Sequence, residues 1–318
     1  MNTQIKKSEF DDLFHNFPGV PVGAEPAPRL HFFHAPNSIC SQKVRSVLAF
    51  HQIPHSSHLL DIFAGETYDP SYVRMRMAGC ASLGGAMADQ HLGTTSVNSS
   101  GCDGCVVPTL LDAETGAVTV DSLRICLALD GGVAGEKLVP AELKDAIMAE
   151  LAVVDDLPNY QNLAVRVVPK TAPGNAFAAS KVERCNTLLA AHGDDPVLRA
   201  AYEAKRAKEQ YAADKLFNEP ALTQARQAVT DALAGLEHRL AAGSGPWLFG
   251  GAVTMADLFW GAELIRTEDV GQGHLWQESH LPNVAAYYGR LCELPALKTA
   301  ILDFPAARLA PQKPAGAA

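Results

Sequence analysis

The sequence is 318 residues long with 47% hydrophobic residues, which is enough for two packed domains and typical of a globular protein. Its formal net charge is −9, from 26 basic and 35 acidic residues, so no cationic field would attract nucleic acid or anionic lipid. No apolar run approaches the roughly 18 residues of a membrane span, and the N-terminal segment lacks the apolar core of a signal peptide. We therefore expect a cytoplasmic protein without nucleic-acid or membrane partners. Its seven cysteines, an odd number spread along a long chain, fit reduced thiols better than a disulfide framework.

Residues 1–28 combine charges, glycine and four prolines without a sustained period, which predicts a flexible N-terminal arm. The pattern of apolar residues changes at Arg29. Residues 30–33 form a short apolar run suited to a buried strand, residues 41–51 have apolar positions at helical spacing, and residues 56–60 suit a second strand. Strand, helix and strand within about 30 residues predict a parallel pair.

Residues 74–104 are rich in Gly, Ser and Ala and have little apolar pattern, so they are interpreted as an insertion lying over the fold. Two strands, 106–112 and 117–120, are then predicted with a hairpin turn between them. The next helix is expected to begin at Asp121-Ser122 and to stop at Gly131-Gly132. Residues 29–132 thus predict a compact α/β domain.

Beyond about Leu138 the pattern is helical throughout, and residues 138–305 predict an all-helical domain. Asp195-Pro196 has the form of a helix cap followed by a first-turn proline, and Pro220 is expected to break or kink the long helix that follows. Thr254 to Asp257 resembles a capping box with Asp in place of Glu. Residues 306–318, rich in Pro and Ala, predict a disordered tail.

The segment from Asn37 to Arg45 places one thiol and two hydroxyls where a strand turns into a helix. Unpaired backbone N–H groups and the positive end of the helix dipole favour a thiolate at Cys40, and Lys43 and Arg45 add positive charge nearby. We therefore expect Cys40 to have a low pKa and to be the most reactive of the cysteines. Taken alone, a cysteine in such a turn is as often a small buried residue as a nucleophile, and Ser38 is more often a helix cap.

Two further segments carry a possible binding function. Pro108 enters a predicted strand and forces Val107 into an extended conformation; such a site often holds a cis peptide, although an ordinary trans proline is the more common reading of this dipeptide. Asp121 and Ser122 suit a plain helix cap, and the alternative is that the same helix start binds a ligand carboxylate.

In this order the three segments resemble the thioredoxin-like domain of glutathione transferases. The similarity covers residues 29–305, and the serine two residues before the cysteine resembles the zeta-like branch of that family. It implies an α/β thioredoxin-like N-terminal domain followed by an all-α C-terminal domain. It also implies glutathione as the cofactor, with Cys40 and Ser38 catalytic. The residues implied in binding glutathione are Ser41, Lys43, Val107, Pro108, Asp121 and Ser122.

Within the family, the segments at residues 38–45, 106–110, 245–250 and 256–260 resemble those of glutathione-dependent reductive dehalogenases. This implies an oxidoreductase that acts on chlorinated hydroquinones or related aromatics through a glutathione conjugate and a mixed disulfide at Cys40. The resemblance also implies a homodimer. Two alternatives stay open: a transferase, ether-cleaving lyase or isomerase that needs only Ser38, and a non-catalytic glutathione-binding stress protein. The residues that contact the second substrate follow no readable motif.

Two other features are not assigned to the site. Cys102 and Cys105 have the spacing of half a zinc or redox motif, but no second Cys or His pair stands at a ribbon-like distance, so no metal is expected. The aromatic residues around Phe259 and Trp260 are interpreted as core between the last helices and not as a substrate box.

Overall fold

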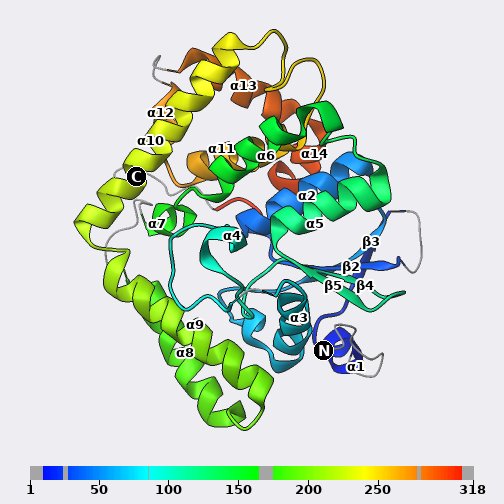
Figure 1. The fold of residues 1–318 in the computed structure, drawn as a ribbon, viewed down its shortest axis with the longest axis vertical. Coiled ribbons are helices and arrows are strands. Elements are labelled where there is room, and N and C mark those ends of the chain that lie inside the picture. Colours follow the sequence, from blue (N-terminus) through cyan, green and yellow to red (C-terminus); the bar gives the residue numbers. More distant parts are fainter. Residues whose placement is uncertain (1–9, 24–27, 85, 165–174, 278–280, 310–318) are drawn as a thin grey trace, which may run out of the picture.

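The computed structural model describes residues 10–23, 28–84, 86–164, 175–277 and 281–309. Figure 1 shows a small sheet with α2 and α5 over one face and α3 below the other, beside a larger helical part. The elements of the first part are α1 (Phe10–Asn16), β1 (Val20–Val22), β2 (Leu30–His34), α2 (Ile39–His51), β3 (His55–Leu59), η2 (Glu66–Tyr68), α3 (Pro70–Ser82), α4 (Val97–Ser100), β4 (Thr109–Asp112), β5 (Ala117–Val120), α5 (Ser122–Ala128) and η3 (Leu129–Ala134).

The five strands form one mixed sheet in the order β1-β3-β2-β4-β5. β2 and β3 are parallel, with Phe32 opposite Ser57, and β4 pairs antiparallel with both β2 and β5. The predicted parallel pair and the predicted hairpin are therefore confirmed. Because β2 is central and its end leads directly into α2, the start of α2 lies at an edge where several loops meet.

The flexible arm predicted for residues 1–28 is wrong for its described part. Leu13 of α1 and Phe17 are buried against the sheet face that α3 covers, and β1 adds an antiparallel edge strand to β3. Burying two large apolar side chains offsets the entropy of ordering this segment. Residues 1–9 and 24–27 lie outside the described residues.

The insertion predicted for residues 74–104 is also wrong in its first third, because α3 continues to Ser82. Val73, Met75 and Cys80 give this helix an apolar side that is buried, although its pattern in the sequence is weak. The insertion proper follows α3 as loops and the short α4. Its end is held by the buried Arg76, whose Nε donates to the carbonyl of Asp103 at 2.7 Å.

In the described residues of the second part the helices are joined by loops, and no β-strand is present apart from an isolated bridge between Trp247 and Gly250, so the predicted helical fold is confirmed. Asp195 caps α9 and Pro196 is its first residue, and the capping box of Thr254 and Asp257 is formed. The long helix α9 ends before Pro220, as expected. Asn218 caps the next helix, α10, and Pro220 lies in the first turn of α10. The elements are η4 (Ala141–Leu143), α6 (Lys144–Asp155), α7 (Asn159–Ala164), α8 (Ala176–His192), α9 (Pro196–Lys215), α10 (Glu219–Ala242), α11 (Met255–Asp269), α12 (His274–Gln277), α13 (Pro282–Glu293), α14 (Pro295–Leu297) and η5 (Lys298–Leu302).

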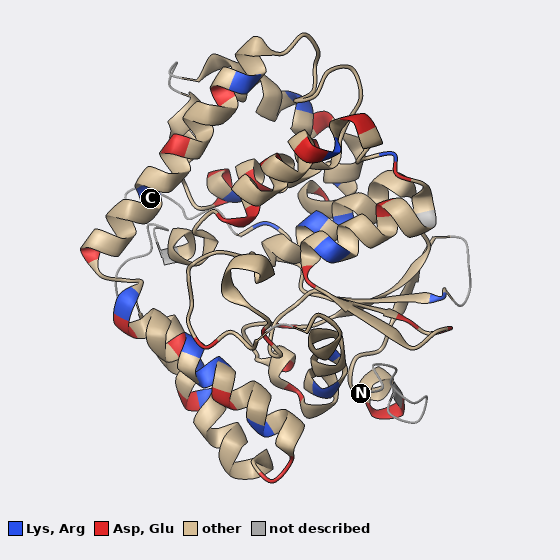
Figure 2. Cartoon of the chain, viewed as in Figure 1, with Lys and Arg blue, Asp and Glu red and all other residues tan. Residues whose placement is uncertain are grey.

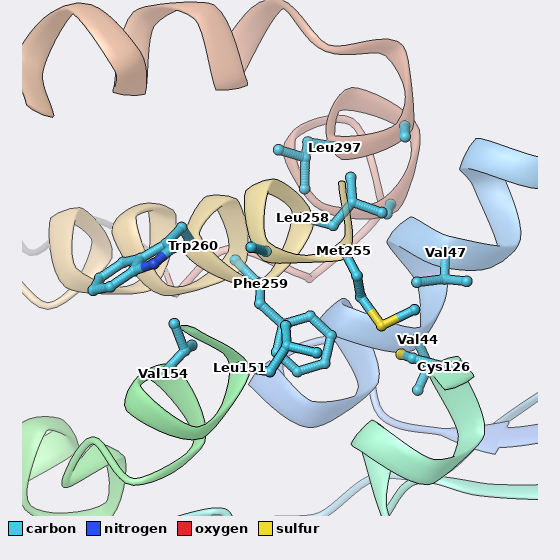
Figure 3. Packing of buried hydrophobic residues seen from close by; sticks show 14 of the residues in the cluster. Val44, Val47, Cys126, Leu151, Val154, Met255, Leu258, Phe259, Trp260 and Leu297 are labelled. Carbon is cyan, nitrogen blue, oxygen red and sulfur yellow. The ribbon is translucent and has the colours of Figure 1, made fainter. Parts of the chain in front are cut away.

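One apolar core joins the two parts. Figure 3 shows side chains of α2, α5, α6 and α11 pointing toward one another, among them Val44, Leu151 and Phe259. Phe259 and Trp260 are fully buried there, as their interpretation as core requires. The predicted disordered tail is wrong at its start, because Ala307 and Leu309 are buried; residues 310–318 lie outside the described residues. Among the helices that the structure describes, none is long and apolar enough to cross a membrane.

Candidate active site

One cavity at the junction of the two parts brings the predicted segments together. Its wall includes the start of α2, the loop before β4, the start of α5, and residues of α7, α8, α9 and α11. Six of the eight predicted site residues line it: Ser38, Cys40, Val107, Pro108, Asp121 and Ser122. Segments more than 80 residues apart in the chain therefore face the same small volume.

Ser38 is the N-cap of α2, and its Oγ accepts a hydrogen bond from the N–H of Ser41 at 3.3 Å. The capping interpretation is confirmed. It does not exclude a role in the site, because a serine hydroxyl that accepts a hydrogen bond still has its own proton to donate. Ser38 is half-buried and lines the cavity, so this proton is available to a ligand thiolate.

The low pKa expected for Cys40 is wrong. Cys40 is the second residue of α2, but burial raises the pKa of its thiol, and this effect is larger than the opposing influence of Lys43 and of the Ser122 hydroxyl. The carboxylates of Asp155 and Asp121 act in the same direction as burial. A contact with Cys80 instead lowers the pKa of Cys102, which makes that buried residue the more acidic thiol. The sequence signal was local, whereas the core against which Cys40 packs includes residues of the distant helices α6 and α11.

Ser41 and Lys43 do not reach the cavity, contrary to their expected place among the glutathione-binding residues. Ser41 is fully buried and its Oγ accepts from the N–H of Ala35 at 3.3 Å. Lys43 is also fully buried and pairs with Asp155 of α6 at 2.6 Å. Both residues hold the start of α2 in place, and Lys43 acts on Cys40 only through its charge.

The peptide bond between Val107 and Pro108 is cis. The preceding carbonyl, of Val106, accepts from the hydroxyl of Tyr72 at 2.7 Å. Within the described residues, the backbone N–H and C=O of Val107 make no hydrogen bond to the protein. A buried residue of this kind needs a partner for its backbone groups, and Val107 faces the cavity.

Asp121 and Ser122 form the start of α5. Asp121 has φ 77°, a left-handed conformation that costs about 1–3 kcal/mol for a residue other than glycine and is typical of functional sites. Its carboxylate pairs with Arg124 at 3.1 Å, and burial raises its pKa. The Oγ of Ser122 is buried with no nitrogen or oxygen atom of the described structure as its hydrogen-bond partner, and it interacts with the thiol of Cys40, whose pKa it lowers. This unpaired hydroxyl at a helix start suits a ligand carboxylate.

The sequence reasoning missed the wall that the helical part contributes. It includes Asp103 of the insertion, Tyr160 of α7, Lys181 of α8, three residues of α9 and Arg266 of α11. A signal existed in α9. Its buried positions follow a helical period, and three of them are charged: Leu198, Ala201, Tyr202, Lys205, Lys208, Glu209 and Ala212. Charged residues on the apolar side of a helix are rarely buried unless they are paired.

Comparison with known proteins agrees with this arrangement. Residues 37–131 match the N-terminal domain of glutathione S-transferases, and residues 219–290 match the C-terminal domain. The chain belongs to the glutathione S-transferase family. The thioredoxin-like fold of its first part and the helical fold of its second part are those of the family.

Two kinds of relative resemble this glutathione S-transferase over most of its length. The 2,5-dichlorohydroquinone reductive dechlorinase of Sphingobium indicum is 36% identical, over 87% of this chain and 84% of the relative. The structure of the beta-etherase LigF from Sphingobium sp. strain SYK-6 has a TM-score of 0.57 at 16% identity, covering 86% of this chain and 98% of that one. A glutathione S-transferase from Methylobacillus flagellatus with glutathione bound has a TM-score of 0.51 at 17% identity, covering 85% and 98%.

Proposed function

We propose that the protein is a glutathione-dependent reductive dehalogenase of chlorinated hydroquinones or related aromatics. The observation that carries the proposal is that the thiol of Cys40 shares one cavity with Ser38, Val107 and Ser122. The dechlorinase relative, 36% identical over most of both chains, supports the substrate class. Glutathione is consumed in this reaction and is therefore a substrate.

The cavity has the groups needed to hold glutathione. The unpaired N–H and C=O of Val107 suit a peptide backbone, and the unpaired hydroxyl of Ser122 at the start of α5 suits its γ-glutamyl carboxylate. The carboxylate of Asp121 suits the adjacent ammonium group. Ser38 would donate its hydroxyl proton to the glutathione thiolate, because its lone pair already accepts from the N–H of Ser41.

The roles of Ser38 and Cys40 follow in sequence. A glutathione thiolate that accepts from Ser38 attacks the chlorinated carbon of the quinonoid tautomer, and chloride leaves with the electron pair of the broken bond. The Cys40 thiolate then attacks the sulfur of the conjugate, and the aromatic carbon takes the electron pair and a proton. A second glutathione thiolate attacks the mixed disulfide and frees Cys40. In total, aryl chloride and two glutathiones give the dehalogenated aromatic, oxidised glutathione and HCl.

A second candidate is a glutathione transfer or ether cleavage that requires Ser38 alone. It is favoured by the raised pKa of Cys40, caused by burial, because a thiol that is largely protonated at neutral pH attacks slowly. A thiol substitution therefore separates the two candidates.

We expect Cys40→Ser to form the glutathione conjugate of a chlorinated hydroquinone but to lose at least 100-fold in release of the dehalogenated product. Forming the conjugate needs only the activated glutathione thiolate, whereas reducing it needs a protein sulfur. The measurement is chromatographic quantification of conjugate, dehalogenated aromatic and oxidised glutathione. Cys292→Ser, at a second half-buried cysteine outside the cavity, is the matched control. Normal yields of dehalogenated product from Cys40→Ser would overturn the mechanism in favour of the second candidate.

Three further proposals concern the whole protein. Family membership supports a homodimer. The change from mixed sheet to helices between η3 and η4 supports two domains that meet near residues 132–138. The absence of a spanning helix among the described residues is compatible with a cytoplasmic location.

A further inference from the structure

Five charged residues of the cavity wall form one ion-pair network, which we call the lysine cluster: Asp103, Lys205, Lys208 and Glu209, which are buried, and Lys181, which is half-buried. One carboxylate oxygen of Asp103 contacts Lys205 at 2.9 Å and Lys208 at 3.1 Å. One oxygen of Glu209 contacts Lys205 at 2.8 Å and Lys181 at 3.3 Å. Every member lines the same cavity as Cys40. Figure 2 shows basic and acidic segments alternating along α8 and α9, where four of the five residues lie.

The lysine cluster holds three ammonium groups against two carboxylates. Neighbouring lysines hold the pKa of Asp103 well below its usual range, and the pKa of Glu209 is lowered to about 2 even though burial opposes this. Both carboxylates are therefore anions at neutral pH, and one positive charge has no counter-charge within the cluster. A buried charge is costly unless it is paired. An anion entering from the cavity would supply the missing partner.

Lys181 is the member through which the cluster would respond to such an anion. Burial lowers the pKa of Lys181 to about 8. The groups that face it are Glu209 and Lys205 from α9, Asp103 from the insertion, Tyr160 from α7 and His91 from the loop before α4. Of these, Glu209 is the direct counter-charge, and it is already shared with Lys205. A second anion beside Lys181 would stabilise its ammonium form.

Flat aromatic side chains surround Lys181. Its Nζ lies 4.5 Å from the ring centre of Tyr160 and 4.1 Å from that of Phe177. Tyr160 also stacks on His91 with ring centres 4.1 Å apart, and Phe177 lies 6.0 Å from Phe63. All four rings line the cavity. Such walls suit a planar aromatic ring, whereas glutathione has none.

We infer that the lysine cluster and these rings form a specificity subsite that takes the aromatic substrate as its phenolate, with the aryl oxygen anion beside Lys181. The inference rests on the proposed function for the identity of the aromatic. A phenolate matches both features of the wall, because its charge supplements the cluster and its ring fits the aromatic side chains. Chlorine substituents withdraw electrons and make a phenol easier to ionise, so the subsite favours chlorinated phenols over their parent compounds.

The test uses the binding of 2,5-dichlorophenol, with its methyl ether 2,5-dichloroanisole as a probe that cannot ionise. Phenolates and phenols differ in ultraviolet absorbance, so the spectrum of the bound ligand reports its ionisation state in the unmodified protein. We expect a phenolate spectrum at a pH where the free phenol is mostly protonated, and at least tenfold weaker binding of the ether. A bound spectrum of the neutral phenol, or equal affinities of phenol and ether, would overturn the inference.

Substitution of Lys181 locates the subsite. Lys181→Gln is expected to raise the Kd of the phenol about tenfold without changing the Kd of the ether or of glutathione, and Lys181→Arg is expected to restore phenol binding. If the Kd of glutathione rises instead, the cluster binds a glutathione carboxylate and the inference is wrong. Repeating the titration with Cys40→Ser keeps this outcome separate from the proposed reaction, since binding of the phenolate does not need the thiol.

Discussion

Ser122 has a buried hydroxyl that lines the cavity and has no nitrogen or oxygen hydrogen-bond partner in the described structure. Its neighbour Asp121 has a positive φ of 77° and also lines the cavity. A folded protein normally satisfies such a buried group. Within the described residues no nitrogen or oxygen atom pairs with this hydroxyl, which supports the proposal that a glutathione carboxylate does so.

We expect Ser122→Ala to weaken glutathione binding about tenfold or more, because a hydrogen bond to a carboxylate contributes about 1.5–3 kcal/mol. The stability of the free protein should change little, since within the described residues no nitrogen or oxygen atom pairs with this hydroxyl. Isothermal titration with glutathione measures the first effect and urea unfolding the second. Ser82→Ala, whose hydroxyl donates to the Gly79 carbonyl in α3, is the control that should leave glutathione affinity unchanged. Unaltered affinity in Ser122→Ala would place the glutathione carboxylate elsewhere.

At the scale of the element, α9 is unusual because its buried side carries charge. Lys205 and Glu209 are four residues apart and contact each other at 2.8 Å, and Lys205 also reaches Asp103 of the insertion. The hydroxyl of Tyr160 donates to Glu209 at 2.6 Å. Glu209 thus connects α7, α8 and α9, and its ionisation affects the packing of all three.

We expect the free energy of unfolding to fall on acidification between pH 4.5 and about 2, in part because of Glu209. Lys205 and Lys181 lower the pKa of Glu209 from 4.5 to about 2 in the folded protein. A carboxyl group with a lowered folded pKa stabilises the fold fully above its unfolded pKa, and the contribution is lost as the pH approaches the folded pKa. The contribution is on the order of 3 kcal/mol. Urea titrations from pH 7 to about pH 2 measure the loss.

Glu209→Gln should therefore be less stable than the unmodified protein at pH 7 but lose less stability on acidification. Glu219→Gln is the matched control, because Glu219 is exposed at the start of α10 and pairs only with Arg226 among the described ion pairs. Its pH profile should run parallel to that of the unmodified protein. If the pH profile of Glu209→Gln is also parallel to that of the unmodified protein, the ionised Glu209 carboxylate does not stabilise the lysine cluster.

At the scale of the whole molecule, one apolar core runs through both parts. Val44 of α2, Leu151 of α6 and Phe259 of α11 belong to the same buried cluster. The buried pair of Lys43 and Asp155, 2.6 Å apart, crosses the same junction. Since neither part can separate without exposing this core, local unfolding of one part alone is costly.

We predict a single unfolding transition for the two parts. The three tryptophans, Trp247, Trp260 and Trp276, all lie in the helical part, so their fluorescence reports that part. The buried cysteines Cys80 and Cys126 lie in the first part, and their reaction with a thiol reagent reports its opening. The two probes should give the same urea midpoint. Leu151→Ala should lower both midpoints together, at a cost of about 2–5 kcal/mol; separate transitions would show that the parts unfold independently.

The sequence alone determined the features that depend on neighbouring residues. Caps, turns and apolar periods act over a few positions, so the start of α5 at Asp121-Ser122, the capping box at Thr254 and the parallel β2–β3 pair could be predicted. The resemblance of these local segments to a known family predicted that Ser38, Cys40, Val107 and Ser122 share one site.

Only the tertiary structure decided what depends on remote residues. Burial raises the pKa of Cys40, and Cys40 packs against a core that includes residues of the distant helices α6 and α11. Lys43 does not line the cavity because it is buried against Asp155 of α6. The order of α1 depends on an apolar face that only the folded sheet provides. The lysine cluster joins the insertion, α8 and α9. No local sequence pattern predicts which charged residues will form ion pairs with one another. Desolvation and ion pairing are set by what covers a group in space, and the sequence near that group does not contain this information.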